Sequence, residues 1–344
     1  MRVAVLNTHV PFVRGGAEQL AEGLVGALRG AGHEVDYLRL PFRWHPDERI
    51  LDHMLAARLL RIPAADLVVG LKFPAYLVSH PNTVLWVLHQ HRQAYDLWGT
   101  PWQGISASAE GRAVRDAIRA ADQRCLAEAQ RVFTISGRVA ERMRDFNAVS
   151  PEVLYPPLLD GGYHGGPDGD YLFYPSRINV LKRQLLAVEA MRHVRSDVRL
   201  VLAGDADTPE DRIRLTEMLA EPRLAGRVQW LDGWIPHERK VELLAGALGC
   251  LFIPFDEDYG YVTVESFTSS KALITCTDSG GPLEFVTDGE TGVVAEPSAE
   301  ALAQAIDRLA ADRAATRRMG DAALGRLDEL GISWPAVVDR LIAP

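Results

Sequence analysis

The sequence predicts an α/β protein with two doubly wound, Rossmann-like domains, each built around a parallel sheet. The chain has 344 residues, which is more than one typical domain holds. Its short apolar runs are continuous rather than alternating, as in strands that are buried on both faces of a parallel sheet. Helical patterns separate these runs, and the whole series occurs twice along the chain.

The first series of strands and helices precedes a segment that is rich in glycine, proline and aspartate. Its expected strands are 2–6, 36–40, 67–70, 84–88 and 131–136, and its clearest helices are 17–32 and 109–130. The segment 155–170, YPPLLDGGYHGGPDGD, reads as a linker or hinge loop.

A second series follows this linker. Its expected strands are 171–175, 199–204, 227–233, 250–254, 272–276 and 292–296, and its expected helices are roughly 180–194, 208–220, 236–246, 261–270, 298–311 and 314–330. We therefore expect one domain over 1–157 and a second over 158–331, facing each other across a cleft. A last amphipathic helix, 332–344, is expected to pack back on the first domain through Trp334.

Composition favours a cytoplasmic protein. Hydrophobic residues make up 47% of the chain, but no run reaches the ~18 apolar residues of a membrane span. The opening MRVAVLNTHV reads as a first strand rather than a signal peptide. The three cysteines are widely spaced, which suits a reducing compartment and neither a disulfide framework nor a metal site. The net charge of −9 argues against a nucleic-acid partner.

The charge is unevenly distributed. Residues 1–157 carry 18 Lys and Arg against 16 Asp and Glu, whereas the remainder carries 19 against 30. The N-terminal domain can therefore approach an anionic surface more easily. Peripheral contact with the inner face of the membrane stays open, through the arginines at 112, 115, 119 and 124. The alternative is an ordinary solvated helix face.

Ligands of open α/β sheets bind beyond the carboxyl ends of the strands, so residues there are candidates for a site. Gly15 and Gly16 open a helix after the first strand, where glycines let a ligand approach backbone N–H groups at the positive end of the helix dipole. The pattern is not GxGxxG, so a dinucleotide is not indicated. The alternative is a plain helix-entry turn.

Histidine and aromatic residues follow the strand 84–88. The strand-end position of His89 favours a functional role, although lone histidines are more often structural. Zinc would need further ligands at suitable spacing, and the sequence offers none. Tyr95, Trp98 and Trp102 either present flat faces to a sugar ring or fill the core.

Two cations follow the strand 171–175. Arg177 offers a fork of donors and Lys182 a mobile point charge. Together they suit a diphosphate that gains charge as a bond breaks. The alternative is a solvated helix start, but the strand-end position favours an anion site.

The stretch EDYGYVTVE places two glutamates around a glycine turn. The amides of Gly260, Tyr261 and Val262 are expected at a helix start, where they form an anion site. Glu257 precedes this helix on the side of the reacting group. Glu265 lies about one turn inside, where its two acceptor oxygens suit a ribose diol. The alternative is that both are exposed acids that favour the helix dipole.

Taken together, these features resemble the retaining glycosyltransferases of family 4, which have the GT-B fold. The resemblance covers nearly the whole chain, and its most specific part is the E-x7-E element at Glu257 and Glu265. The other matching elements are GGAE at 15–18, GHEV at 32–35, the Arg177 and Lys182 pair, LDGWIPHE at 231–238, and Gly280, Gly281, Glu284 and Gly292. One departure is Lys271, which stands where the family usually has a glycine.

The resemblance implies a nucleotide-sugar donor bound by domain 158–331, an acceptor bound by domain 1–157, and no metal or other cofactor. The implied roles are the diphosphate for Arg177 and Lys182, the ribose for Glu265, the donor sugar for Glu257 and His89, and a phosphate-binding amide at Gly16. The acceptor is expected to be a glycan, a lipid-linked sugar or a small metabolite, and Tyr95, Trp98 and Trp102 are its tentative contacts.

The expected function is therefore transfer of a hexose-type sugar from a nucleotide-diphosphate sugar to an acceptor hydroxyl, with retention, in glycan or natural-product biosynthesis. Two alternatives remain open. A nucleotide-sugar epimerase or hydrolase of the same fold would release product without an acceptor, and a non-catalytic protein would bind the sugar nucleotide without turnover.

Overall fold

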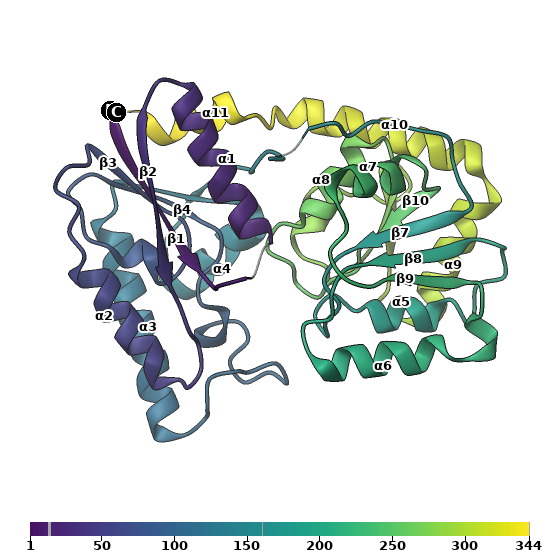
Figure 1. The fold of residues 1–344 in the computed structure, drawn as a ribbon, viewed down its shortest axis with the longest axis horizontal. Helices are drawn as coiled ribbons and strands as arrows, with labels where there is room; N and C mark the ends of the chain where they lie inside the picture. The colour runs from purple at the N-terminus through teal and green to yellow at the C-terminus, as the bar shows by residue number, and fades with distance from the viewer. Residues whose placement is uncertain (13–14, 160, 344) are drawn as a thin grey trace. The chain divides into compact units, whose positions relative to one another are not determined.

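The computed structural model describes residues 1–12, 15–159 and 161–343. Residue 160 of the expected linker and residue 344 of the expected last helix lie outside these ranges. The chain divides into two compact units. Unit 1 is Met1–Leu159 with Ile332–Pro344, and unit 2 is Asp160–Gly331. Within the described ranges each unit holds one six-stranded parallel sheet (Figure 1), which confirms the predicted α/β class.

The sheet of unit 1 has the order β2-β1-β3-β4-β5-β6. Its strands are β1 (Arg2–His9), β2 (Glu34–Pro41), β3 (Leu67–Gly70), β4 (Thr83–Val87), β5 (Arg131–Thr134) and β6 (Glu152–Val153). The prediction missed β6, because its two residues are both exposed and give no apolar run.

Helices flank this sheet. They are α1 (Gly16–Gly30), α2 (Glu48–Leu59), α3 (Ala109–Glu128), α4 (Gly137–Asn147) and α11 (Trp334–Ile342), with short 3₁₀ turns at Ala75–Leu77 and Arg92–Ala94. The last helix, α11, packs beside α1 (Figure 1). Trp334 anchors it, because its indole N–H donates to the carbonyl of Leu158 at 2.9 Å. A Cβ on Gly23 of α1 would lie 2.1 Å from the same ring, so only glycine fits there.

The sheet of unit 2 has the order β12-β11-β10-β7-β8-β9. Its strands are β7 (Tyr171–Pro175), β8 (Arg199–Ala203), β9 (Val228–Leu231), β10 (Gly249–Leu251), β11 (Leu273–Cys276) and β12 (Gly292–Ala295). All its strands are parallel, but the order in which the chain adds them reverses between β7 and β10. Doubly wound sheets bind ligands at such a switch point.

The helices of unit 2 are α5 (Gln184–Ala190), α6 (Pro209–Leu219), α7 (His237–Ala245), α8 (Tyr261–Thr268), α9 (Ala299–Ala311) and α10 (Arg313–Leu330), with 3₁₀ turns at Pro222–Leu224 and Gly281–Glu284. Figure 1 shows α5 and α6 on one face of the sheet and α7 and α8 on the other.

Helix α5 is shorter than the predicted 180–194. Asn179 accepts from the amides of Lys182 and Arg183, which forms a turn before the helix. Arg183 has φ +57, a conformation that an α-helix cannot contain. The turn matters because it carries Lys182 at the carboxyl end of β7.

The strands form the core of both units, as their continuous apolarity predicts. The largest fully buried side chains include Trp86 and Phe133 in unit 1, and Tyr174, Phe173 and Phe252 in unit 2. Across the part of the chain that the structure describes, no helix is long and apolar enough to cross a membrane.

Candidate active site

In unit 2, the loop that carries Glu257 is joined to the loop of the glycine pair. The amide of Glu257 donates to the carbonyl of Ser279 at 2.9 Å, and its carbonyl accepts from Gly281 at 2.8 Å. Gly280 has φ +70, and a Cβ there would lie 2.6 Å from the carbonyl oxygen of Glu257. The close approach of the two loops therefore requires a glycine. The loop of Glu257 and the loop of Gly280 and Gly281, which are separate motifs in the sequence, thus lie side by side at the carboxyl ends of the strands.

Lys182 and Glu257 meet at this edge. The ammonium of Lys182 donates to Oε2 of Glu257 and lies 5.3 Å from the centre of the Phe252 ring. Both side chains keep about a fifth of their surface exposed, 18% for Lys182 and 23% for Glu257. An ammonium has three hydrogens, so this ion pair leaves Lys182 able to bind a further anion.

Arg177 is held by a different carboxylate. Its Nη1 donates to both oxygens of Asp207, at 2.9 and 3.1 Å, and the side-chain amide Nδ2 of Asn179 donates to Oδ2 of the same carboxylate at 2.7 Å. Half of the Arg177 side chain is exposed. Arg177 therefore pairs with Asp207 and Lys182 with Glu257, so the two cations have different carboxylate partners.

Glu265 lies in the interior of unit 2. Only 4% of the residue is exposed, so the alternative of an exposed helix-start acid is wrong for Glu265. Its Oε1 accepts from the ammonium of Lys240 at 2.6 Å and from the hydroxyl of Tyr163 at 3.1 Å. The sequence did not point to Lys240 or Tyr163, because a contact between residues 163 and 265 leaves no local pattern.

Helix α8 begins at Tyr261, as predicted, with Gly260 as its N-cap, and it ends at Thr268 rather than at residue 270. Gly260 has φ +86 and caps the helix without a side-chain hydrogen bond, and a Cβ there would lie 2.8 Å from the Phe252 ring. The amides of Tyr261 and Val262 belong to the first turn of the helix, which has no acceptor of its own for them. The anion site expected at this helix start stays a prediction.

Two predicted site elements belong to unit 1. Gly15 is the N-cap of α1, with φ −170 and no side-chain hydrogen bond, and Gly16 begins the helix. His89 follows β4 and is half-buried. Its Nδ1 donates to the carbonyl of Gln90 at 2.7 Å. In a neutral imidazole this leaves Nε2 as the acceptor.

The three aromatic residues proposed for the acceptor differ in their surroundings. Tyr95 is 3% exposed and its hydroxyl donates to Oδ2 of Asp122 at 2.8 Å, so it fills the core. The guanidinium of Arg115 covers the Trp98 ring at 4.7 Å. Trp102 is half-buried.

Asp122 is a buried acid that the sequence did not single out. Its two oxygens accept from the hydroxyls of Tyr76 at 2.9 Å and Tyr95 at 2.8 Å. Burial raises the pKa of Asp122 to about 7, although both hydrogen bonds act in the opposite direction. Its helical spacing from Val114, Ile118 and Cys125, which are also buried, was the available signal.

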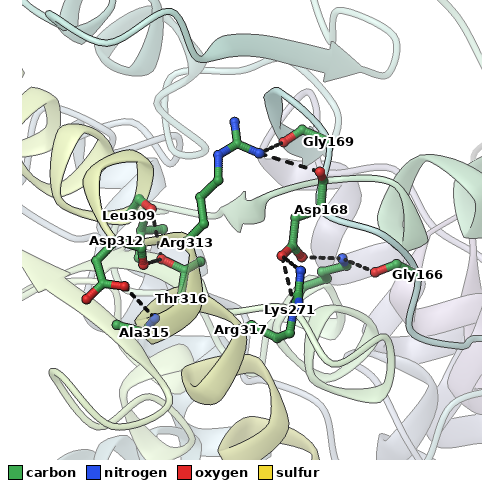
Figure 2. A network of polar contacts seen from close by, with 10 residues as sticks. All are labelled: Gly166, Asp168, Gly169, Lys271, Leu309, Asp312, Arg313, Ala315, Thr316 and Arg317. Atoms are coloured by element: carbon green, nitrogen blue, oxygen red, sulfur yellow. Dashed lines mark hydrogen bonds and ion pairs between the residues drawn. The ribbon is translucent and has the colours of Figure 1, made fainter.

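Lys271 was expected to stand where the family has a glycine, and Figure 2 shows its side chain in a polar network with Gly166 and Asp168. The residue with the glycine-like conformation is Ser270, at φ +52. The side chain of Lys271 is 2% exposed. Its ammonium donates to the carbonyl of Gly166 at 3.1 Å and lies 3.4 Å from Asp168, which Arg317 also binds. Lys271 therefore anchors the end of the linker segment to unit 2.

The cysteines and possible metal ligands add no further site. Cys125, Cys250 and Cys276 are free and buried, and burial raises the pKa of each thiol to about 12. Residues 1–12, 15–159 and 161–343 contain no group of three or more His, Cys, Asp or Glu placed to hold a metal ion.

Comparison with known proteins places these features in a family context. Residues 166–326 match the family described as "Glycosyl transferases group 1". The chain is 26% identical to the alpha-maltose-1-phosphate synthase of Mycolicibacterium smegmatis, over 99% of this chain and 98% of that protein. It is also 26% identical to the human alpha-1,3/1,6-mannosyltransferase ALG2, but there the match covers 55% of this chain and 51% of the relative.

Solved structures show the same fold over the whole chain. Sucrose-phosphate synthase from Thermosynechococcus elongatus superposes with a TM-score of 0.77, at 20% identity over 99% of this chain and 97% of that one. Anabaena HepE in complex with UDP and glucose gives a TM-score of 0.71, at 16% identity over all of both chains. The fold is therefore GT-B, and together with the group 1 match these findings support a GT-B glycosyltransferase.

Proposed function

We propose that the protein is a retaining, metal-independent glycosyltransferase that moves a hexose-type sugar from a nucleotide-diphosphate sugar to an acceptor hydroxyl. The observation that carries the proposal is the meeting of Lys182 and Glu257 at the carboxyl edge of the second sheet. Solved structures of the same fold contain UDP, glucose or UDP-glucose, which supports a nucleotide-sugar donor. In this proposal unit 2 binds the donor and unit 1 the acceptor.

The diphosphate is the leaving group, and its growing charge must be stabilised. Lys182 and Arg177 supply fixed positive charge, and the amides of Gly260, Tyr261 and Val262 supply the positive end of a helix. By analogy with oxyanion-hole donors, each such group contributes roughly 3–4 kcal/mol to transition-state stabilisation. The ion pair with Glu257 holds the Lys182 ammonium in place before the donor arrives.

The remaining residues orient the donor. Glu257 accepts hydrogen bonds from hydroxyls of the donor sugar near the reacting carbon, and Glu265 accepts from the ribose. For Gly15, Gly16 and His89 of unit 1, a role toward the donor stays a prediction. These roles are carried over from the family resemblance at the positions that match its motif.

The reaction exchanges one bond at the anomeric carbon for another on the same face. The bond between this carbon and the diphosphate oxygen breaks, and the acceptor oxygen forms the new bond. The acceptor proton passes to the departing phosphate oxygen. This route needs no strong protein base and retains the anomeric configuration.

The acceptor contacts of the proposal belong to unit 1. The buried hydroxyl of Tyr95 is hydrogen bonded to Asp122, so the proposal assigns the acceptor contacts to Trp98 and Trp102. Arg115 and Arg119 stack over Trp98 and Tyr95, so half of the arginine row that was considered for a membrane surface serves the fold of unit 1. The proposal therefore includes no membrane contact through Arg115 or Arg119.

A thermal-shift panel of UDP-, GDP-, dTDP- and ADP-sugars tests the donor, because stabilisation rises with ligand concentration over Kd. We expect a large shift with one nucleotide, and nuclear magnetic resonance of the product should show retained configuration. An inverted product would contradict the mechanism. Release of free sugar or an epimer without acceptor would favour the epimerase or hydrolase, and binding without turnover would favour a binding protein.

A further inference from the structure

The carboxylate of Glu265 is engaged on one oxygen only. Oε1 accepts from Lys240 at 2.6 Å and from Tyr163 at 3.1 Å. A carboxylate offers about four lone-pair sites, two on each oxygen. Two donors therefore saturate Oε1. Among the residues that the structure describes, no donor is hydrogen bonded to Oε2.

The two donors are themselves fixed. The Lys240 ammonium lies 5.7 Å from the centre of the Tyr163 ring, and this ring meets His237 edge-on at 5.3 Å. His237 donates to the carbonyl of Gly161 at 2.8 Å. Lys240 and His237 are three residues apart on α7, so they share one face of that helix. Helix α7 and the segment 161–163 thus hold Oε1 from one side.

Burial makes this support necessary. The side chain of Glu265 is 6% exposed and that of Lys240 is 17% exposed. A carboxylate in such surroundings is costly without a cation and hydrogen bonds. Lys240 supplies the cation, and Tyr163 restricts rotation of the carboxylate. The consequence is a charged group with one oxygen, Oε1, held by protein donors.

We propose that Lys240 and Tyr163 are positioning residues that hold Oε1 of Glu265, so that Oε2 alone accepts both hydroxyls of the donor ribose. The proposal rests on the proposed function and refines it, because the sequence had assigned both oxygens to the diol. Two vicinal hydroxyls can donate to the two lone pairs of one oxygen. Neither positioning residue needs to touch the nucleotide.

The test compares two ligands on the full chain by calorimetry. UDP, ADP and GDP identify the preferred nucleoside diphosphate, which is then compared with its 2′,3′-dideoxy analogue. We expect Lys240→Met to weaken the diphosphate at least about tenfold, the size of one lost charge-assisted hydrogen bond, and to leave the dideoxy analogue within about twofold. Tyr163→Phe should show the same pattern with a smaller loss, and Lys240→Arg should restore part of the affinity.

Arg239→Met is the matched control, since Arg239 is the neighbouring residue on α7 and pairs with Glu242 on the surface. It should bind both ligands as the wild type does. Equal losses for both ligands in Lys240→Met, or no loss for either, would overturn the proposal. If that variant does not fold, Tyr163→Phe removes one hydroxyl and decides the question alone. If the wild type binds the diphosphate and its dideoxy analogue equally, the ribose role of Glu265 is wrong, and the positioning proposal fails with it. If the wild type binds no nucleotide at all, the proposed function is contradicted as well.

Discussion

Both units bury a carboxylate in a polar network, Glu265 in unit 2 and Asp122 in unit 1, and these two networks differ in their partners. Glu265 of unit 2 faces the ammonium of Lys240, whereas Asp122 of unit 1 accepts from the hydroxyls of Tyr76 and Tyr95. A neighbouring cation offsets the free-energy cost of burying a carboxylate more than neutral phenol hydroxyls do. Burial therefore raises the pKa of Asp122 to about 7. In our proposal the carboxylate of Glu265 serves a ligand, whereas Asp122 is a structural acid of unit 1.

The largest expected effect concerns the structural acid. The pKa of Asp122 in the folded chain is about 7, against about 4 when unfolded, so the folded state favours the protonated form. This contribution to stability is complete below about pH 4 and is lost as pH rises towards about 7, by up to about 4 kcal/mol. Urea unfolding from pH 4.5 to 8 should show this loss in the wild type.

The Asp122→Asn variant sharpens the comparison, because it keeps the shape of the side chain and removes the titration. Its unfolding free energy should vary less with pH than that of the wild type over the same range. If both proteins show the same pH dependence, Asp122 does not titrate in the way that its burial implies, and the contrast with Glu265 disappears.

The second largest effect concerns catalysis. Lys182→Ala should lower kcat by about 10²–10³-fold, the typical loss for one donor to a developing negative charge, and change the donor KM less. Arg177→Ala should show the same split. Turnover with the nucleotide sugar found in the thermal-shift panel measures both.

Arg199→Ala is the control for these variants. Arg199 also forms an ion pair, with Asp170. Arg199 is the first residue of β8, so this pair lies at the amino-terminal ends of the strands, away from Lys182. Arg199→Ala should leave kcat unchanged. Wild-type turnover in Lys182→Ala and Arg177→Ala would refute their role in leaving-group stabilisation.

Sequence patterns predicted the strands of both sheets well, because buried parallel strands are continuous apolar runs. They also placed Lys182 and Glu257 after strands and Gly260 directly before a helix, as the structure has them. They missed the partners Lys240 and Tyr163, whose contacts with Glu265 span 25 and 102 residues. They also assigned the glycine-like position to Lys271 rather than Ser270, because the backbone conformation is not visible in the residue type.

A third, smaller effect tests whether the backbone fixes the Glu257 edge of unit 2. Gly280→Ala should destabilise the protein by about 2 kcal/mol, because it combines a positive φ with a close contact. Gly233 is the matched control: its φ is +93, but a Cβ there would meet nothing within 4 Å. Thermal unfolding should show a larger loss for Gly280→Ala than for Gly233→Ala. Equal losses would mean that the contact with Glu257 adds no constraint.

The smallest effect concerns the Asp168 network. Arg317 is 65% exposed and pairs with the buried Asp168, so Arg317→Ala should cost less than about 1 kcal/mol. Lys271→Met should cost more, because Lys271 is buried and also holds the carbonyl of Gly166. Chemical denaturation of both variants measures the difference, and the reverse order would show that burial does not set the strength of these contacts.

The most direct test of the central claim is whether Lys182 recognises the diphosphate. Calorimetry should compare a nucleoside diphosphate with the corresponding monophosphate on the wild type and on Lys182→Ala. We predict that the wild type binds the diphosphate at least about tenfold more tightly, the size of one charge-assisted hydrogen bond, and that the variant loses most of this preference. An unchanged preference in the variant would contradict the assignment of the Lys182 and Glu257 edge as the diphosphate site.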